Sequence, residues 1–205
     1  MDWFVYGTLR YVNSSDDYKV MRILNYSKGR ESTIVEVYSA TLESWREVKT
    51  DVRLDVTTSS CDAIVEGFTY WVIRNTNEPH NTLIASFNLR SETFSIIPVP
   101  EVLVTEYHSF RAMNHHESLA LLAYTSHDEF KKCLEVWVIE GGSCSEGVWQ
   151  KKFTFGMGFD FSTHWGLTSG DIVVENAPNM PFLFNLRTKQ CRIMGTRVIH
   201  SVFYY

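Results

Sequence analysis

The densest group of potentially reactive side chains in this sequence is His115-His116-Glu117, which has the residue types of a zinc site. Neighbouring residues of a strand point to opposite faces, so His115 and His116 cannot both face one ion without a bulge. Zinc takes three or four protein ligands, and no further ligands follow at a useful spacing. We therefore expect this cluster to be structural, and we expect the protein to use no metal and no other cofactor.

Two further pairs have the residue types of catalytic groups. Asp16-Asp17 has the composition of a carboxylate pair, but its place before a strand favours a turn in which aspartate bonds its own backbone. His164 and Cys191 fall in one stretch of the chain, yet a catalytic thiol also needs an orienting third group and an oxyanion donor, and neither is evident. Motifs for phosphate binding, a nucleophile elbow and a zinc protease are absent from the sequence. We therefore expect no enzymatic activity and no catalytic residues.

A short pattern recurs four times along the chain and defines the elements that must position any site. Each copy opens on an aromatic residue that leads into a turn, and these residues are Tyr38, Phe87, Trp137 and Phe184, at steps of 49, 50 and 47 positions. The sequence Phe-Asn-Leu-Arg occurs in both the second and the fourth copy. A steady period near 50 residues built from strands is typical of a propeller of the kelch kind.

The stretches around each copy alternate with period two and are rich in Val, Ile, Thr, Tyr and Phe, which indicates strands. We therefore predict an all-β fold, a partial kelch-like β-propeller of about four blades, each an antiparallel four-stranded sheet, with no helix. The single domain covers 1–205, with repeat units at about 3–50, 51–100, 101–155 and 156–205. The predicted strands are 4–12, 18–26, 33–39, 45–49, 63–66, 69–74, 83–88, 94–98, 119–124, 134–139, 148–153, 165–168, 171–175, 181–185, 191–194 and 198–205.

Composition narrows the classes of partner. A formal net charge of −5 argues against nonspecific nucleic-acid binding, which depends on basic surface. The amino terminus has no signal-peptide pattern, and no window approaches the apolar length of a membrane span. We expect a soluble intracellular protein, cytoplasmic or nuclear, that binds neither nucleic acid nor membrane. The four cysteines fit buried free thiols.

The six tryptophans are expected to pack between blades, because large aromatic side chains dominate protein cores. Trp71 and Trp137 lie within predicted strands, so we assign both to the core. Trp3 and Trp165 are the two that we expect to be exposed.

Several segments, in order and at matching spacing, resemble the F-box-associated domain of plant F-box proteins. They are Asp16-Asp17-Tyr18-Lys19-Val20-Met21-Arg22-Ile23, Gly67-Phe68-Thr69-Tyr70-Trp71, Ile84-Ala85-Ser86-Phe87-Asn88-Leu89, Ile97-Pro98-Val99-Pro100, Leu134-Glu135-Val136-Trp137-Val138-Ile139 and Trp149-Gln150-Lys151. The S-locus F-box subfamily, which binds ribonucleases in pollen, is similar in the same places.

The resemblance implies a protein–protein interaction module that recognises the substrate of an SCF-type ubiquitin ligase, with an S-RNase as the substrate in an S-locus F-box-like case. It also implies that scaffold docking belongs to an F-box, which we expect to be absent here because the chain opens within the associated domain. The alternatives are a hydrolase or glycan-binding module on a propeller fold, and a truncated remnant without function.

In a four-stranded blade, the loop between the second and third strands lies on the same ring face in every unit, and loops on a rigid scaffold commonly carry specificity. These loops are polar, mixed in charge and varied in length. We therefore predict partner-binding residues there: Lys28, Arg30, Glu31, Glu78, His80, His127, Asp128, Glu129, Lys131 and Asn179.

Overall fold

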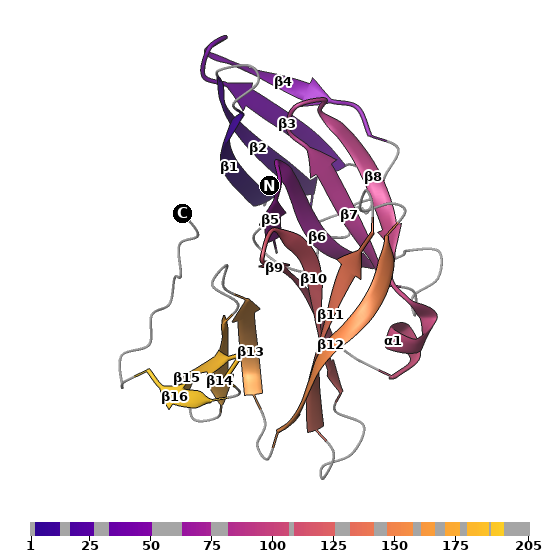
Figure 1. The fold of residues 1–205 in the computed structure, drawn as a ribbon. Helices are drawn as coiled ribbons and strands as arrows, with labels where there is room; N and C mark the ends of the chain where they lie inside the picture. The colour runs from indigo at the N-terminus through magenta and orange to yellow at the C-terminus, as the bar shows by residue number, and fades with distance from the viewer. Residues whose placement is uncertain are drawn as a thin grey trace. The chain divides into compact units, whose positions relative to one another are not determined.

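The computed structural model forms four antiparallel sheets of four strands within the residues it describes, and the spatial order of strands in each sheet follows the chain (Figure 1). The described residues are 3–12, 17–26, 33–50, 63–74, 82–106, 109–125, 132–141, 147–157, 161–166, 171–176, 180–188 and 190–194. This pattern of consecutive hairpins confirms the predicted all-β class and the blade-like repeat unit.

The sheets are named A to D in chain order. Sheet A contains β1 (Trp3–Val12), β2 (Asp17–Tyr26), β3 (Thr33–Ser39) and β4 (Ser44–Val48). Sheet B contains β5 (Ala63–Val65), β6 (Phe68–Arg74), β7 (Thr82–Asn88) and β8 (Thr93–Pro98). Sheet C contains β9 (Ser109–His115), β10 (Ser118–Thr125), β11 (Lys132–Glu140) and β12 (Val148–Met157). Sheet D contains β13 (Phe161–Gly166), β14 (Asp171–Asn176), β15 (Met180–Asn185) and β16 (Cys191–Ile193).

Two elements correct the sequence-based prediction. The expectation of no helix was wrong, because α1 (Glu101–Glu106) follows Pro100, whose carbonyl accepts hydrogen bonds from the amides of Leu103 and Val104. Six residues are too few to show helical periodicity, but proline before an acidic first turn suits a helix start. Strand β9 was also missed, because Arg111 and Asn114 interrupt its apolar alternation. The predicted strand at 198–205 lies outside the described residues.

Two hairpins close on two-residue turns in which both residues have positive φ. Glu66 and Gly67 have φ of 47° and 88° between the paired residues Val65 and Phe68. His116 and Glu117 have φ of 49° and 63° in the turn that joins β9 to β10. Such turns match the twist of a hairpin and favour glycine or asparagine. The first turn contains the favoured glycine, Gly67, whereas His116 and Glu117 are both residue types that rarely occupy such a turn.

In three of the four copies of the repeat, the polar residue after the leading aromatic caps the turn that follows, whereas Val138 follows Trp137 in the third copy. The Ser39 hydroxyl accepts a hydrogen bond from the Leu42 amide at 3.1 Å, and the Asn88 side chain accepts one from the Arg90 amide at 2.8 Å. Asn185 does the same for the Thr188 amide at 2.7 Å. Because this bond holds the backbone in its turn, it accounts for the recurrence of Ser or Asn at this position of the repeat.

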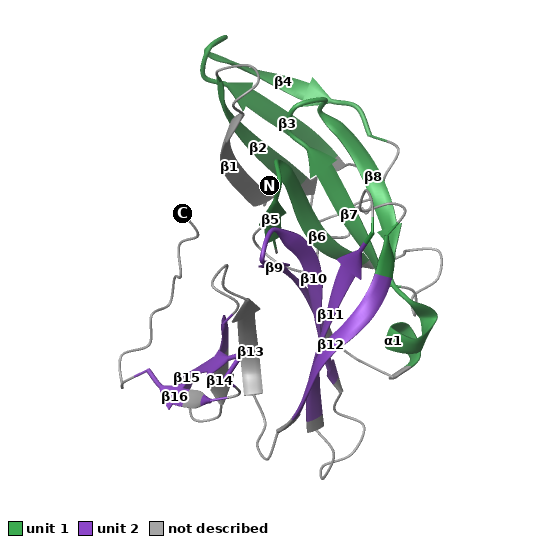
Figure 2. Ribbon diagram, in the orientation of Figure 1, with its two compact units in different colours: residues 1–105, 141–148 green, residues 106–140, 149–205 purple. Residues whose placement is uncertain are grey.

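The chain divides into two compact units, residues 1–105 with 141–148 and residues 106–140 with 149–205 (Figure 2). Within the first unit, the aliphatic face of sheet A covers the aromatic face of sheet B. The core there consists of Met21, Ile23, Val35, Val37, Trp71, Ile73, Ala85, Phe87 and Leu89.

The second unit repeats this arrangement with sheets C and D. Its core consists of Met113, Ala120, Leu122, Leu134, Val136, Val138, Phe155, Ile172 and Leu186, with Phe184 packed against it. The ring of Phe184 meets that of Phe155 edge to face at 4.4 Å between centroids. In both units, the leading aromatic of the later sheet therefore faces the earlier sheet.

The tryptophans only partly follow the prediction that they pack in the core. Trp71 is fully buried, as predicted, and Trp137 is half-buried. Trp45 was expected in the core and is instead 40% exposed, because it lies on the outer strand β4 and on the face of sheet A that points away from sheet B. The side chains of Trp3 and Trp165, which were expected to be exposed, lie outside the described residues.

Candidate interaction surface

The ten residues predicted to bind a partner lie in the loops between the second and third strands of the four sheets. All ten fall at 28–31, 78–80, 127–131 and 179, which are outside the described residues. The structure does define the strands from which these loops emerge, β2–β3, β6–β7, β10–β11 and β14–β15, which pair as neighbours in their sheets. The predicted contact residues therefore stay predictions.

A second candidate surface is the face of sheet A that points away from sheet B. Strand alternation places Met21 and Ile23 on the buried side and Tyr18, Val20 and Arg22 on this side. Tyr18 is 59% exposed and Trp45 is 40% exposed, which is unusual for large aromatic side chains. We call this surface the aromatic face of sheet A; it comprises Tyr18, Val20, Arg22, Glu36, Tyr38 and Trp45.

Contacts within the aromatic face hold its side chains in place. The Arg22 guanidinium lies over the Trp45 ring at 4.0 Å from its centroid, and its Nε donates to the Glu36 carboxylate at 2.6 Å. The rings of Tyr38 and Trp45 are tilted against each other at 5.3 Å between centroids. A partner that binds here would therefore meet side chains that are already ordered, which lowers the entropic cost of association.

Tryptophan, tyrosine and arginine are the residue types most enriched among the energetic centres of protein interfaces. This surface was not expected from the sequence, because the tryptophans, Trp45 among them, were predicted to pack between blades. A usable signal was present in β2, where one side of the alternation carries Tyr18 and Arg22 while the other carries the apolar residues Met21 and Ile23. Arginine is rarely buried in an apolar core, so Arg22, four positions after Tyr18 on the same side of β2, indicates an exposed face.

The turn end of sheet A is held by a carboxylate network. Asp17 accepts hydrogen bonds from the Ser39 hydroxyl at 2.6 Å and from the Thr41 amide at 2.9 Å. These bonds hold the pKa of the Asp17 carboxyl below its usual value, because they favour the charged form. Asp17 thus braces the β3–β4 turn, which corrects the expectation that it would bond the backbone of its own turn.

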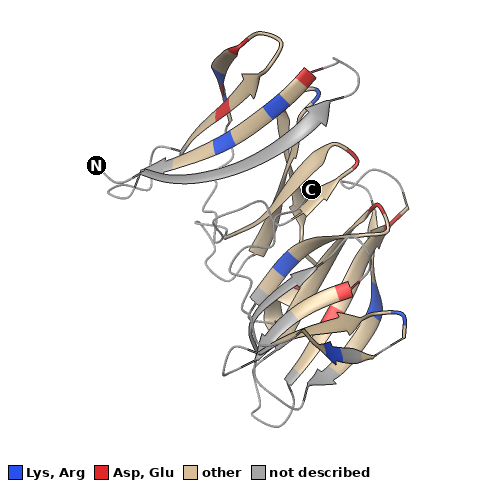
Figure 3. Ribbon diagram, turned by 90° about the vertical axis from the view of Figure 1, so that its left-hand side faces the viewer, with Lys and Arg blue, Asp and Glu red and all other residues tan. Residues whose placement is uncertain are grey.

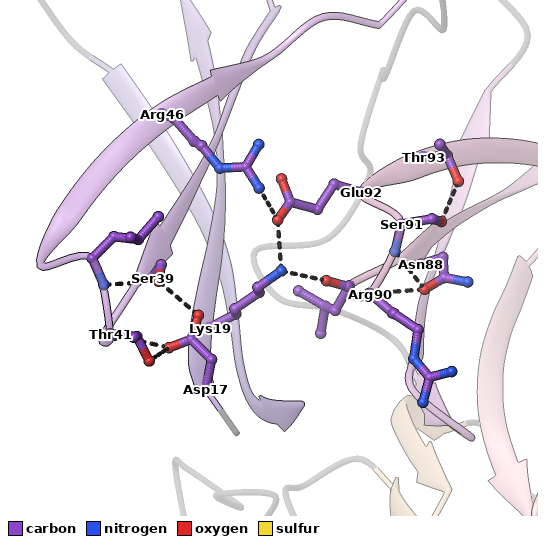
Figure 4. Close-up of polar contacts among 12 residues, drawn as sticks. Asp17, Lys19, Ser39, Thr41, Arg46, Asn88, Arg90, Ser91, Glu92 and Thr93 are labelled. Carbon is purple, nitrogen blue, oxygen red and sulfur yellow. Dashed lines mark hydrogen bonds and ion pairs between the residues drawn. The ribbon is translucent and has the colours of Figure 1, made fainter. Parts of the chain in front are cut away.

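A second network joins sheet A to sheet B (Figure 4). The Lys19 ammonium donates to the Glu92 carboxylate at 2.7 Å and to the Leu89 carbonyl at 3.1 Å. Arg46 forms an ion pair with the same Glu92 oxygen. The Glu92 side chain is only 6% exposed, so two cations offset the cost of burying one carboxylate.

Sheet C also contains a buried carboxylate, Glu135. It accepts hydrogen bonds from the Trp137 indole at 2.8 Å, the Lys151 ammonium at 3.0 Å and the Thr154 hydroxyl at 3.1 Å. Three donors on one carboxylate tie it into a side-chain network of the sheet. Glu135 therefore joins strands β11 and β12 of sheet C.

The His115 cluster does not form a metal site within the described residues, where no three side chains of the ligand types come together. His115 ends β9, and its ring stacks edge to face on His116 at 4.5 Å and on Phe153 at 5.9 Å. Burial lowers the pKa of His115, and the positive charges of His116 and Lys152 lower it further. In the described part of the chain its Nδ1 is buried without a hydrogen-bond partner, so the ring is held as a neutral aromatic.

The other reactive side chains give no catalytic grouping that can be described. The side chains of His164 and Cys191 lie outside the described residues. The Cys133 side chain is half-buried. Acidic and basic residues occur within the same sheets (Figure 3). The one helix in the described ranges, α1, is too short to cross a membrane.

Comparison with known proteins gives one family over nearly the whole chain. The family model of the F-box associated beta propeller domain matches residues 2–202. A relative from Arabidopsis thaliana, named as an F-box protein, is 31% identical over 137 residues, which cover 63% of this chain and 36% of the relative. The match thus spans about a third of that relative's length. A mannose phosphorylase structure from Leishmania mexicana, in complex with phosphate ion, covers 94% of this chain and 69% of its own at 8% identity and a TM-score of 0.46.

Proposed function

The chain belongs to the F-box associated β-propeller domain family, and on that premise we propose that it is a substrate-recognition module that captures a protein for ubiquitination. The observation that carries the proposal is the exposed aromatic face of sheet A. Tyr18 and Trp45 stand exposed on a rigid sheet, and Arg22 is fixed between Trp45 and Glu36. Preordered aromatic and arginine side chains are the anchors that protein interfaces use.

The family supports an association with F-box proteins, in which a separate F-box would dock on the ligase scaffold. We propose that this chain only captures the substrate protein. The predicted loop residues, such as Lys28, Glu78 and His127, would supply specificity around the anchor, because loops can vary without disturbing the sheets that carry them.

A capture-and-ubiquitination experiment tests this function. The chain is expressed in plant cells with an F-box joined to its amino terminus, and captured proteins are scored for scaffold-dependent ubiquitination. We expect the double variant Tyr18→Ala/Trp45→Ala to lose a protein that the unchanged chain captures and ubiquitinates. Ile193→Ala is the matched control, because Ile193 is 57% exposed on sheet D.

Loop variants separate the two candidate surfaces. Lys28→Ala/Arg30→Ala and His127→Ala/Asp128→Ala are tested in the same assay. Capture that survives the loop and aromatic-face changes alike, or capture that never leads to ubiquitination, would contradict the proposed function. Loss with the loop variants alone would move the site from sheet A to the loops.

The finer assignment, a ribonuclease partner of the S-locus type, rests on the family resemblance alone. We propose an S-RNase as one candidate partner, and its binding can be measured by titrating purified S-RNase into the chain in a calorimeter. Saturable binding that Trp45→Ala weakens would support this case, and an absence of heat at micromolar concentrations would remove it.

We also propose that the module binds rather than catalyses. Its buried carboxylates Asp17, Glu92 and Glu135 are engaged in bonds that hold turns and sheets together. The competing hydrolase or glycan-binding function predicts that divalent metals or a glycan panel raise the melting temperature. A clear shift with any of them would count against our proposal.

A further inference from the structure

Sheet B shows how an aromatic face of this repeat binds another sheet. Phe87 and Trp71 are fully buried beneath the aliphatic side chains of β2 and β3, among them Met21 and Val37. Phe87 also meets Phe94 of the outer strand β8 at 4.7 Å between ring centroids. The occupant of this aromatic face is therefore a pair of strands with an aliphatic surface.

A charged contact marks the edge of that interface. Lys19, at the end of the aliphatic strand β2, places its ammonium between the Leu89 carbonyl and the Glu92 carboxylate of the β7–β8 turn (Figure 4). Both acceptors belong to the sheet whose aromatic face is covered. The β7–β8 turn thus binds one specific side chain of the covering sheet, a lysine at the end of its aliphatic strand.

Sheet A carries the same turn on its own aromatic face. Ala40 takes the place of Leu89: the Ala40 amide donates to the Tyr18 carbonyl at 2.9 Å, as the Leu89 amide donates to the Gly67 carbonyl at 3.3 Å. Glu43 takes the place of Glu92, and the two share the left-handed backbone conformation, with φ of 49° and 57°.

The aromatic residues of the two sheets also correspond. Tyr38 and Trp45 form a cross-strand pair in sheet A, as Phe87 and Phe94 do in sheet B. Sheet B's pair is covered, whereas Trp45 and Glu43 are exposed. Sheet A therefore has the aromatic pair and the turn glutamate of the aliphatic-strand receptor, with its carboxylate facing solvent. In the place of the cross-strand pair Trp71 and Ala85 it carries the ion pair of Arg22 and Glu36.

We infer that the aromatic face of sheet A, together with Glu43, docks a strand pair of a partner protein that presents aliphatic side chains and a lysine at the end nearest Glu43. The inference rests on the proposed function and specifies its partner by chemistry. Glu43 occupies the position in the turn of sheet A that Glu92 occupies in the turn of sheet B, where Glu92 binds Lys19. A positively charged side chain of the partner would therefore complement Glu43. The aliphatic side chains would cover Tyr38 and Trp45 as β2 and β3 cover Phe87.

The probe is a head-to-tail cyclised β-hairpin peptide, with its folding verified by circular dichroism. One face displays the side chains of the internal occupant, those of Lys19, Met21, Ile23, Val35 and Val37. Binding of the labelled peptide to the whole chain is followed by fluorescence anisotropy. We expect saturable binding that Trp45→Ala abolishes.

A double-mutant cycle identifies the charged contact. Glu43→Gln in the chain and norleucine for lysine in the peptide should each weaken binding by roughly tenfold, a typical effect of removing one partner of a charge-assisted bond. Both changes together should weaken binding no more than either one alone, because they remove the same contact. Glu117→Gln is the control, since Glu117 is also an exposed turn glutamate with positive φ, 63°.

Three results would overturn the inference. They are no saturable binding of the folded hairpin, equal effects of Glu43→Gln and Glu117→Gln, and additive effects in the cycle. If the hairpin does not bind, the proposed function can still hold, because the capture assay detects any protein whose capture is lost with Tyr18→Ala/Trp45→Ala. Failure of the proposed function would instead appear as capture that survives the aromatic-face and the loop changes alike, or as capture that never leads to ubiquitination.

Discussion

Lys19 and Glu92 are 73 positions apart in the sequence, and their charged groups meet at 2.7 Å. Their side chains are 9% and 6% exposed, so water screens the pair little. The Lys19 ammonium also donates to the Leu89 carbonyl, and Arg46 pairs with the same Glu92 oxygen. Because the contact forms only when sheet A sits in one position on sheet B, it fixes the register of the two sheets.

Removal of Lys19 should destabilise the fold strongly. Lys19→Met leaves the buried Glu92 carboxylate with Arg46 alone, and we expect the free energy of unfolding to fall by about 2–4 kcal/mol. Urea denaturation followed by circular dichroism measures the change. The exposed pair of Lys152 and Glu140 is the control, where Lys152→Met should cost about 0.5 kcal/mol or less. Equal costs at the two sites would refute the role of the buried pair.

Two tryptophans should differ sharply in their effect on stability. Trp71 is fully buried in the first core, so Trp71→Ala should lower the free energy of unfolding by about 3–5 kcal/mol. Trp45 is 40% exposed, so Trp45→Ala should cost about 1 kcal/mol or less while it removes the anchor of the aromatic face. The half-buried Trp137 should fall between them. Chemical denaturation of the three variants checks the order, and a larger loss at Trp45 than at Trp71 would contradict the burial described above.

Stability should depend on pH through His115. Burial keeps the pKa of His115 below the ordinary value of 6.5, so the unfolded chain binds a proton that the folded chain excludes. The stabilisation by neutral His115 is present above that value and is lost as the pH falls from 6.5 through the folded pKa. We expect His115→Phe to flatten the decline in unfolding free energy between about pH 7 and pH 5.

The control for this pH effect is His116→Phe, which changes the exposed neighbour and should leave most of the decline in place. His116 and Lys152 are the charged groups that act on His115, so Lys152→Met should raise its pKa slightly. A decline as steep in His115→Phe as in the unchanged chain would show that other groups dominate the titration.

The β9–β10 turn should gain stability from residues that tolerate positive φ. His116→Asn with Glu117→Gly creates the preferred two-residue turn and should raise the free energy of unfolding by about 1 kcal/mol. Gly67→Ala is the converse test, because an added Cβ meets no atom within 4 Å and only the φ of +88° opposes it. That variant should lose about 1 kcal/mol in thermal or urea unfolding. An unchanged stability in both cases would mean that these turns bear no strain.

The sequence predicted the strands of the repeat well because their signals are local. Alternation through β2, β3, β6 and β7 reflects which residues fit a pleated surface, and the Ser or Asn cap found in three of the four repeat copies acts within three residues. Helix α1 was not predicted because it is too short to show a periodic pattern, and strand β9 was not predicted because polar residues interrupt its alternation. The predicted loop residues of the binding site, from Lys28 to Asn179, lie outside the described residues and stay predictions.

The sequence by itself determined the β class, the period of about 50 residues and the aromatic-to-turn hairpins, because each depends on neighbours a few positions apart. It also carried the family assignment, which the match over residues 2–202 establishes. Only the tertiary structure decided that Lys19 would meet Glu92 and that Trp45 would stay exposed. Those outcomes depend on which sheet face is covered by another sheet, and no local pattern encodes contacts between residues that are seventy positions apart.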